Sequence, residues 1–332
     1  MSTGSLDAKS ISTGALPLID MAGLRSPDRA DWVPLGQALR KACRNKGFLY
    51  LKGHGVSADL RAKVFDQTQL FFELPIKQKI KIDLSYSKCF RGYEPMRGQT
   101  LEAGQPPDLK EGFYAGRELT SDDPRVEAGK FNHGPNQWPE ELPAFRPVMN
   151  EYYNTMRDLG RLLMRGIAVS LGVDEKYFSA FCSEELATLR LLHYPPQPAN
   201  PEPGEKGCGA HTDFGTFTFL MQDDCGGLQV WDEDIGWIHA TPVPDTYVVN
   251  LGDMMARWTN GRYRSTLHRV VNVSGKERYS VPFFYLGNPD FEINCIPTCL
   301  EEGGAPQYPP ATVEQHYQEM YEATYSAADA SI

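Results

Sequence analysis

Residues 216–251 read TFTFLMQDDCGGLQVWDEDIGWIHATPVPDTYVVNL, and this stretch decides the fold. It contains apolar runs, separated by turns rich in Gly, Pro and Asp, at 216–221, 228–231, 237–240 and 247–251. Similar runs flank it at 189–194, 265–271 and 279–286. Seven short strands at this spacing predict an all-β sandwich or barrel.

Helical patterns surround this β-rich stretch. Apolar residues that recur every three or four positions predict helices over 34–46, 57–74, 147–171 and 312–325. Residues 83–145 contain many Gly and Pro and show little periodicity, which indicates a long loop region. The aromatic residues of this region favour an ordered loop that packs on the rest of the protein.

The composition narrows the class of protein. The chain has 332 residues, a formal net charge of −10, 23% charged and 41% hydrophobic residues, which predicts a folded chain with a sizeable core. The acidic balance argues against a nucleic-acid surface. Apolar runs are far shorter than a membrane span, and residues 1–12 lack the apolar stretch of a signal peptide. Because the seven cysteines form no Cys-x-x-Cys pair, we expect reduced thiols and a cytoplasmic location.

Of the seven histidines, only His211 is followed by a carboxylate two positions later, in His211-Thr212-Asp213. This spacing places both side chains on one face of a strand. A second histidine, His268, lies in a β-type run 55 residues after Asp213. Two imidazoles and one carboxylate on one face of a metal, with open positions beside them, are typical of non-haem Fe(II) oxygenases.

Arg278 and Ser280 follow His268 after a turn at 274–276 and share one face of a strand. A guanidinium offers a planar fork for a carboxylate, and a neighbouring hydroxyl adds a donor. Inside a barrel, this pair would hold the far end of a dicarboxylate whose other end reaches the metal. The arrangement fits 2-oxoglutarate.

With these residues, the chain resembles the Fe(II)/2-oxoglutarate-dependent dioxygenases of the isopenicillin N synthase-like family. The order His-x-Asp, about 55 residues, His, ten residues, Arg-x-Ser carries most of the resemblance. Further similar segments span nearly the whole chain, namely LPLID at 16–20, GFLYLKGHG at 47–55, FFELP at 71–75, RLLHYPP at 190–196, NLGD at 250–253 and NGRY at 260–263.

The resemblance implies a mainly β fold, with a double-stranded β-helix (jelly roll) core buttressed by N-terminal and C-terminal α-helices. Residues 1–15 are expected to be a disordered lead-in. The helix-rich region 16–180 is expected to pack on the catalytic core at 181–300, and 301–332 to form a C-terminal helix and tail. All of these parts are expected to form one integrated domain.

The resemblance also implies an oxidoreductase that hydroxylates, desaturates or cyclises a small molecule while 2-oxoglutarate is converted to succinate and CO2. Fe(II) would be held by His211, Asp213 and His268, and 2-oxoglutarate by Arg278 and Ser280. Tyr194 matches a family tyrosine before the metal motif and is assigned to the cosubstrate as well. O2 is the second cosubstrate, and ascorbate is a candidate reductant.

A further group of residues is expected to form the substrate pocket. Arg91, Tyr93, Arg97, Phe113 and Trp258 are candidates for the pocket wall. Phe283 and Phe284 are expected to fill the barrel, and His193 to be structural. We expect neither a nucleic-acid nor a membrane partner, and neither the substrate nor the oligomeric state is defined.

Three other interpretations stay open. An isopenicillin N synthase-type oxidase uses the same iron triad without 2-oxoglutarate and also carries the Arg-x-Ser pair. A non-catalytic metal-binding jelly-roll protein is expected to have lost one of the five site residues, and all five are present. A zinc hydrolase could use the two histidines and Asp213 but would leave Arg278 and Ser280 without a role.

Overall fold

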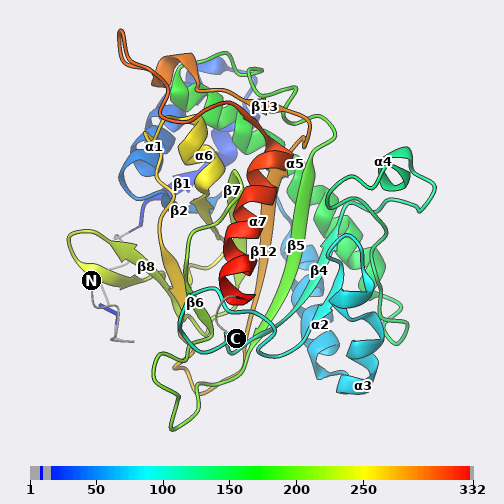
Figure 1. Cartoon of the computed structure of the whole chain (residues 1–332). Coiled ribbons are helices and arrows are strands. Elements are labelled where there is room, and N and C mark those ends of the chain that lie inside the picture. Colours follow the sequence, from blue (N-terminus) through cyan, green and yellow to red (C-terminus); the bar gives the residue numbers. More distant parts are fainter. Residues whose placement is uncertain (1–7, 10–15, 330–332) are drawn as a thin grey trace.

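Two β-sheets form the centre of the protein, seen here in a computed structural model that describes residues 8–9 and 16–329 (Figure 1). The larger sheet has the order β1-β2-β10-β7-β12-β5-β4-β3. Its strands are β1 (Leu18–Asp20), β2 (Phe48–Lys52), β3 (Gly92–Glu94), β4 (Glu111–Gly116), β5 (Leu186–Tyr194), β7 (Phe217–Gln222), β10 (Tyr247–Leu251) and β12 (Arg278–Gly287).

The smaller sheet has the order β6-β11-β8-β9, with β6 (Cys208–His211), β8 (Leu228–Asp232), β9 (Gly236–His239) and β11 (His268–Val270). A short pair, β13 (Glu292–Ile293) and β14 (Ala311–Thr312), lies apart from both sheets. Apart from the parallel pair β1 and β2, the strand pairs are antiparallel. Two opposed, largely antiparallel sheets are the architecture of a jelly roll, which confirms the expected fold class.

The two sheets meet through one buried apolar cluster. It includes Tyr50 and Val248 from the large sheet, and Leu228, Val230 and Val270 from the small sheet. Strand alternation explains the packing, because every second side chain of each strand points toward the other sheet. The space between the sheets is therefore filled, except where polar side chains line a cavity.

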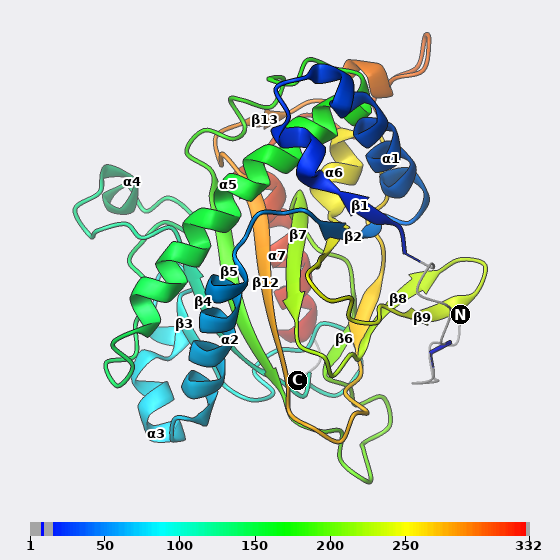
Figure 2. The same cartoon turned by 180° about the vertical axis from the view of Figure 1, so that it is seen from behind.

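Helices surround the large sheet. They are α1 (Trp32–Asn45), α2 (Ala58–Glu73), α3 (Ile76–Lys79), α4 (Pro124–Glu127), α5 (Phe145–Leu171), α6 (Asp253–Trp258) and α7 (Val313–Asp329). The long helix α5 and the last helix α7 lie on opposite faces of this sheet (Figures 1 and 2). Helix α5 packs closely, since a Cβ on Gly160 would meet the ring of Tyr285 on β12 at 2.5 Å. It ends at Gly172, whose φ of 74° is readily adopted by glycine.

Two elements differ from the sequence-based expectation. The region 83–145 contains β3 and β4, which extend the large sheet beyond β5. Its glycines hide this pattern, and Gly116 is needed because a Cβ there would meet the Arg91 guanidinium at 2.1 Å. Of residues 1–15, expected to be disordered, all except 8–9 lie outside the described residues.

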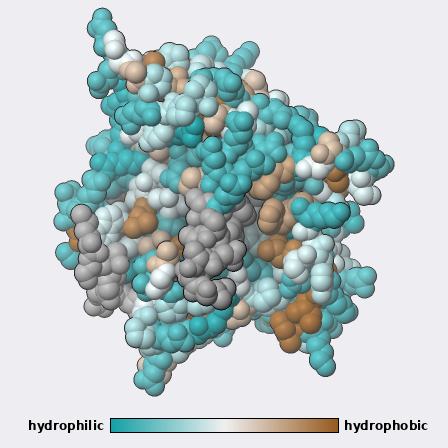
Figure 3. Space-filling model, viewed as in Figure 1, coloured by the Kyte–Doolittle hydropathy of each residue, from teal (hydrophilic) through white to brown (hydrophobic). Residues whose placement is uncertain are grey.

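The face in Figure 3 is mostly hydrophilic, and its apolar residues form small separate groups. Within the described ranges, no helix combines the length and the apolar character needed to cross a membrane.

Candidate active site

His211, Asp213 and His268 converge between the two sheets. His211 ends β6 and His268 begins β11, and the two residues are register partners. The Nε2 atoms of His211 and His268 lie 3.7 and 3.8 Å from Oδ1 of Asp213. One ligand atom from each residue lies within 4.8 Å of the other two, so that one metal ion can be held by all three.

Hydrogen bonds orient each of these side chains. Nδ1 of His211 donates to the carbonyl oxygen of Gly209 (2.8 Å), and Nδ1 of His268 donates to that of Thr266 (3.1 Å), which leaves both Nε2 lone pairs toward Asp213. Oδ2 of Asp213 accepts two hydrogen bonds, at 2.5 Å from the hydroxyl of Thr218 and at 2.6 Å from the amide of Asn250. Oδ1 therefore remains as the ligand atom.

The protonation states suit metal binding. Burial opposes ionisation of Asp213, but the two imidazoles and the hydrogen bonds to its carboxylate outweigh burial and hold its pKa below the usual value. Burial, reinforced by the nearby His211, lowers the pKa of His268 to about 4. At neutral pH the site thus presents a carboxylate and a neutral His268 imidazole, which are the forms that bind a metal.

Helix α6 fixes the loop that carries Asp213. The backbone N–H of Asp253 donates to the carbonyl oxygen of Asp213 (2.8 Å), and the hydroxyl of Thr212 donates to the Asp253 carboxylate (3.0 Å). Gly252 permits this approach, since a Cβ at that position would lie 2.3 Å from the carbonyl oxygen of Gly215. The first turn of α6 therefore sets the position of the carboxylate.

Arg278 lies in the same cavity as the triad and is fully buried. Its Nε donates to the carbonyl oxygen of Gly226 (2.5 Å), its Nη1 lies 3.3 Å from the hydroxyl of Ser280, and its guanidinium stacks over the ring of Tyr194 at 4.7 Å. Among the described residues, no carboxylate lies within ion-pair distance of it. A buried cation without an anion nearby is costly, which marks this end of the cavity as an anion site.

Comparison with known proteins agrees with this geometry. Residues 186–287 match the model of the 2OG-Fe(II) oxygenase superfamily, and residues 16–141 match a model described as the non-haem dioxygenase in morphine synthesis N-terminal region. The chain is 43% identical to the 2-oxoglutarate-Fe(II) type oxidoreductase hxnY of Emericella nidulans, over 95% of this chain and 92% of that protein. This chain belongs to the 2OG-Fe(II) oxygenase superfamily.

Two further relatives of this oxygenase differ in the small molecules that their descriptions name. The homoarginine-6-hydroxylase 2-ODD-233 of Oryza sativa subsp. japonica is 37% identical, over 91% of this chain and 95% of that one. A full-length Neurospora crassa protein, crystallised with alpha-KG (2-oxoglutarate) and thymine, has a TM-score of 0.81 and 32% identity, and the match covers 93% of this chain and 97% of that one. Family membership confirms the expected enzyme class, with Fe(II) and 2-oxoglutarate as cofactors.

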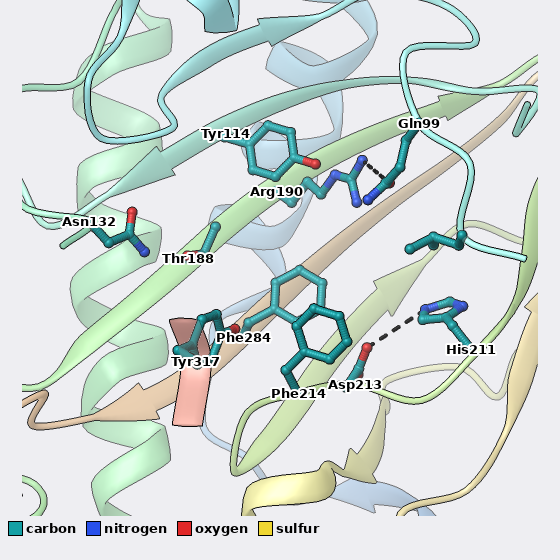
Figure 4. Close-up of a pocket in the computed structure, with 11 residues that line it drawn as sticks. Gln99, Tyr114, Asn132, Thr188, Arg190, His211, Asp213, Phe214, Phe284 and Tyr317 are labelled. Atoms are coloured by element: carbon teal, nitrogen blue, oxygen red, sulfur yellow. Dashed lines mark hydrogen bonds and ion pairs between the residues drawn. The ribbon is translucent and has the colours of Figure 1, made fainter. Parts of the chain in front are cut away.

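A second cavity of about 100 Å³ opens beside His211 and Asp213 of the oxygenase (Figure 4). One side of it is aromatic, with Phe214, Phe284 and Tyr317, and across from these lie Arg190 and Tyr114. Its remaining lining residues are Gln99, Leu101, Asn132 and Thr188. This cavity is the place where a substrate can approach the metal-binding side chains.

The guanidinium of Arg190 in this cavity is already paired. It forms an ion pair with the buried Glu94, donates to Oε1 of Gln99 (3.0 Å) and stacks over the ring of Tyr114 at 4.4 Å. Its Nε is buried and has no hydrogen-bond partner among the described residues. Arg190 therefore adds no excess positive charge to the cavity wall.

The five residues expected on the substrate wall lie elsewhere. Arg91 bonds to the side chain and backbone of Asn132, and the hydroxyl of Tyr93 donates to Glu111. The exposed Arg97 pairs with the buried Glu205. Phe113 packs in one aromatic cluster of the core, with Phe71, Phe145 and Trp138. Trp258 packs in another, with Phe178, Phe181 and Phe291. None of the five lines either cavity at the triad.

Strand alternation, which is visible in the sequence, identifies several of the lining residues that were not expected. The even-numbered side chains of β12 at 278–284 and of β5 at 188–194 line the two cavities. The odd-numbered neighbours, such as Phe283, belong to the apolar core. Phe283 thus fills the core as expected, whereas Phe284 lines both cavities, because a one-residue step reverses the direction of a side chain. His193 points away from the cavities and bonds to Glu111 and Glu277.

Proposed function

We propose that this protein hydroxylates a small, uncharged, planar molecule in an Fe(II)- and 2-oxoglutarate-dependent reaction that releases succinate and CO2. His211, Asp213 and His268 hold the iron, and Arg278 and Ser280 bind the distal carboxylate of 2-oxoglutarate. The ring of Tyr194 stacks against the guanidinium of Arg278 and helps to hold it in place. The iron and the cosubstrate would supply the oxidising chemistry, and the protein positions them and the substrate relative to one another.

The isolated charge of Arg278 carries the cosubstrate part of this proposal. The guanidinium is fully buried in the cavity that the triad lines, and no described carboxylate neutralises it. The distal carboxylate of 2-oxoglutarate would supply the missing anion through charge-assisted hydrogen bonds, with the hydroxyl of Ser280 as a further donor. A zinc hydrolase would leave this position without an occupant, and the titration described below distinguishes 2-oxoglutarate from the substrate of an oxidase.

The substrate class follows from the second cavity. Phe214, Phe284 and Tyr317 offer ring faces on which a planar molecule can stack. Because Glu94 already balances the charge of Arg190, a neutral carbonyl or hydroxyl oxygen suits this wall better than a carboxylate. The Neurospora crassa relative was crystallised with thymine and with 5-formyluracil, which are planar and uncharged.

A two-step assay tests the proposal. In the first step, Fe(II) is titrated into the protein without oxygen, and a visible absorption band is expected only when 2-oxoglutarate is also present. Iron binding without such a band would refute the cosubstrate assignment. In the second step, uncharged ring compounds and charged amino acids are compared by succinate release and by product mass. Strong acceleration by charged amino acids alone would refute the substrate class.

A further inference from the structure

The strand that ends in His211 lies at an edge of its sheet. β6 pairs with β11 on one side, and no described strand pairs with it on the other. The open edge is covered instead by residues 99–110, which have no regular secondary structure and are named the strap here. The strap thus takes the place of a neighbouring strand beside a metal-binding residue.

Two carboxylates of the strap bind the open edge. Oε2 of Glu102 accepts from the backbone N–H of Ala210 (2.8 Å), and Oδ1 of Asp108 accepts from the backbone N–H of Gly209 (2.8 Å). Ala210 directly precedes His211, and the carbonyl oxygen of Gly209 accepts the hydrogen bond from Nδ1 of His211. The strap therefore holds the same peptide groups that orient the imidazole.

Each of these carboxylates has its own lysine. Nζ of Lys206 donates to Oε2 of Glu102 (2.8 Å), and Lys110 forms an ion pair with Asp108. Both lysines and Asp108 are buried. Each lysine thus balances the charge of a carboxylate that accepts from the backbone.

The strap also approaches closely enough to require a glycine. A Cβ on Gly209 would lie 2.7 Å from Cβ of Glu102 and 2.9 Å from its backbone nitrogen. The same strap reaches the substrate side, since Gln99 bonds to Arg190 and Leu101 lines both cavities. One segment therefore contacts the metal-binding strand and the wall of the substrate cavity.

We propose that Glu102 and Asp108 are positioning residues, which hold the open edge of β6 so that His211 faces Asp213 and His268. The inference rests on the proposed iron site. It assigns the strap a role in metal affinity that does not involve contact with the metal. The acceptor oxygen is the essential feature, and the charge of the carboxylate is secondary.

Glu102 offers the sharper test, because its side chain is 18% exposed whereas that of Asp108 is buried. Truncation of Glu102 therefore opens a smaller buried cavity than truncation of Asp108. In Glu102→Ala, the Ala210 N–H loses its acceptor, and Fe(II) affinity is expected to fall about 10–100-fold, the range typical of groups that orient a ligand. Glu102→Gln retains an acceptor oxygen and is expected to restore most of the affinity. Lys206→Met removes only the balancing charge and is expected to have a smaller effect.

The measurements are an anaerobic Fe(II) titration and hydrogen exchange of the 208–211 amides in the metal-free protein. Exchange is expected to be faster in Glu102→Ala and close to wild type in Glu102→Gln. Glu141→Ala is the matched control, since Glu141 is 21% exposed and pairs with Lys81 at 2.7 Å, far from the site in sequence. Wild-type affinity and exchange in Glu102→Ala would overturn the inference. Failure of the wild-type protein to bind iron would instead overturn the proposed function.

Discussion

His211 and His268 lie directly opposite each other on the paired strands β6 and β11, with ring centroids 4.2 Å apart. The residues are distant in sequence, and the register of one antiparallel pair brings them together. Asp213 then completes the site from the loop after β6, which is anchored by α6. The geometry of the candidate metal centre is therefore a property of strand register as much as of the three residue types.

Replacement of Asp213 by Ala should abolish iron binding. This carboxylate is the acidic member of the triad, and both histidine Nε2 atoms face its Oδ1. We expect Fe(II) affinity to fall more than about 100-fold, because groups that merely orient ligands already contribute 10–100-fold. Anaerobic titration calorimetry measures this, with Asp59→Ala on the surface of α2 as the control. Retained binding would refute the metal assignment.

Replacement of Arg278 by Gln should act on the cosubstrate. Loss of charge-assisted hydrogen bonds, at about 1.5–3 kcal/mol each, should raise the KM for 2-oxoglutarate at least about tenfold. Thermal stability without 2-oxoglutarate should not fall, because the variant removes a buried charge that lacks a described carboxylate partner. Steady-state kinetics and melting curves test both expectations, with the exposed Arg264→Gln as the control. An unchanged KM would contradict the anchoring role.

Thr218 should influence metal affinity without contact with the metal. Its hydroxyl donates to Oδ2 of Asp213, so Thr218→Val keeps the shape of the side chain but releases one carboxylate oxygen. We expect about a 10–100-fold loss of Fe(II) affinity with little change in the affinity for 2-oxoglutarate. Thr155→Val, on the exposed face of α5, is the control, since its hydroxyl bonds only within the helix. Equal affinity in both variants would show that the hydrogen bond does not matter.

Acid should destabilise the fold partly through Glu111. Burial would raise the pKa of this carboxyl, but hydrogen bonds with His193, Lys79 and Tyr93 outweigh burial and hold its pKa below 4.5. Its stabilising contribution is therefore fully present above about pH 4.5 and is lost as the pH falls through the lowered value.

Glu111→Gln should cost about 3–5 kcal/mol at pH 7, because the buried Lys79 loses its charge partner. The variant should also lose less stability than wild type when the pH is lowered from 5 to 3. Urea unfolding at several pH values checks this, with the exposed Glu301→Gln as the control. Parallel pH profiles for wild type and Glu111→Gln would contradict the assignment.

The residues proposed for the metal and the cosubstrate could be predicted from the sequence because short-range periodicity encodes them. His211 and Asp213 are two positions apart, as are Arg278 and Ser280, and this spacing alone places each pair on one face. The same rule applied to β5 and β12 would also have identified Arg190 and Phe284.

For the other residues of the substrate wall, the sequence contains no comparable periodic pattern. Gln99 and Asn132 lie in irregular segments, so no period indicates the direction of their side chains. Tyr317 reaches the cavity from α7 through tertiary packing, with His316 bonded to the carbonyl oxygen of Phe214. The aromatic residues expected on this wall instead pack in the core, Arg91 bonds to Asn132 and Arg97 pairs with Glu205, and these partners are set by the complete fold.

The substrate cavity is lined by residues from separate segments of the chain, and these segments can change independently during evolution. Gln99, Asn132 and Tyr317 come from segments outside the stretch that carries the triad and Arg278. Point mutations at these three positions can alter which molecule is recognised while the triad and Arg278 are inherited unchanged. An ancestral reaction can thus be passed on to new molecules without exchange of the strap that holds β6.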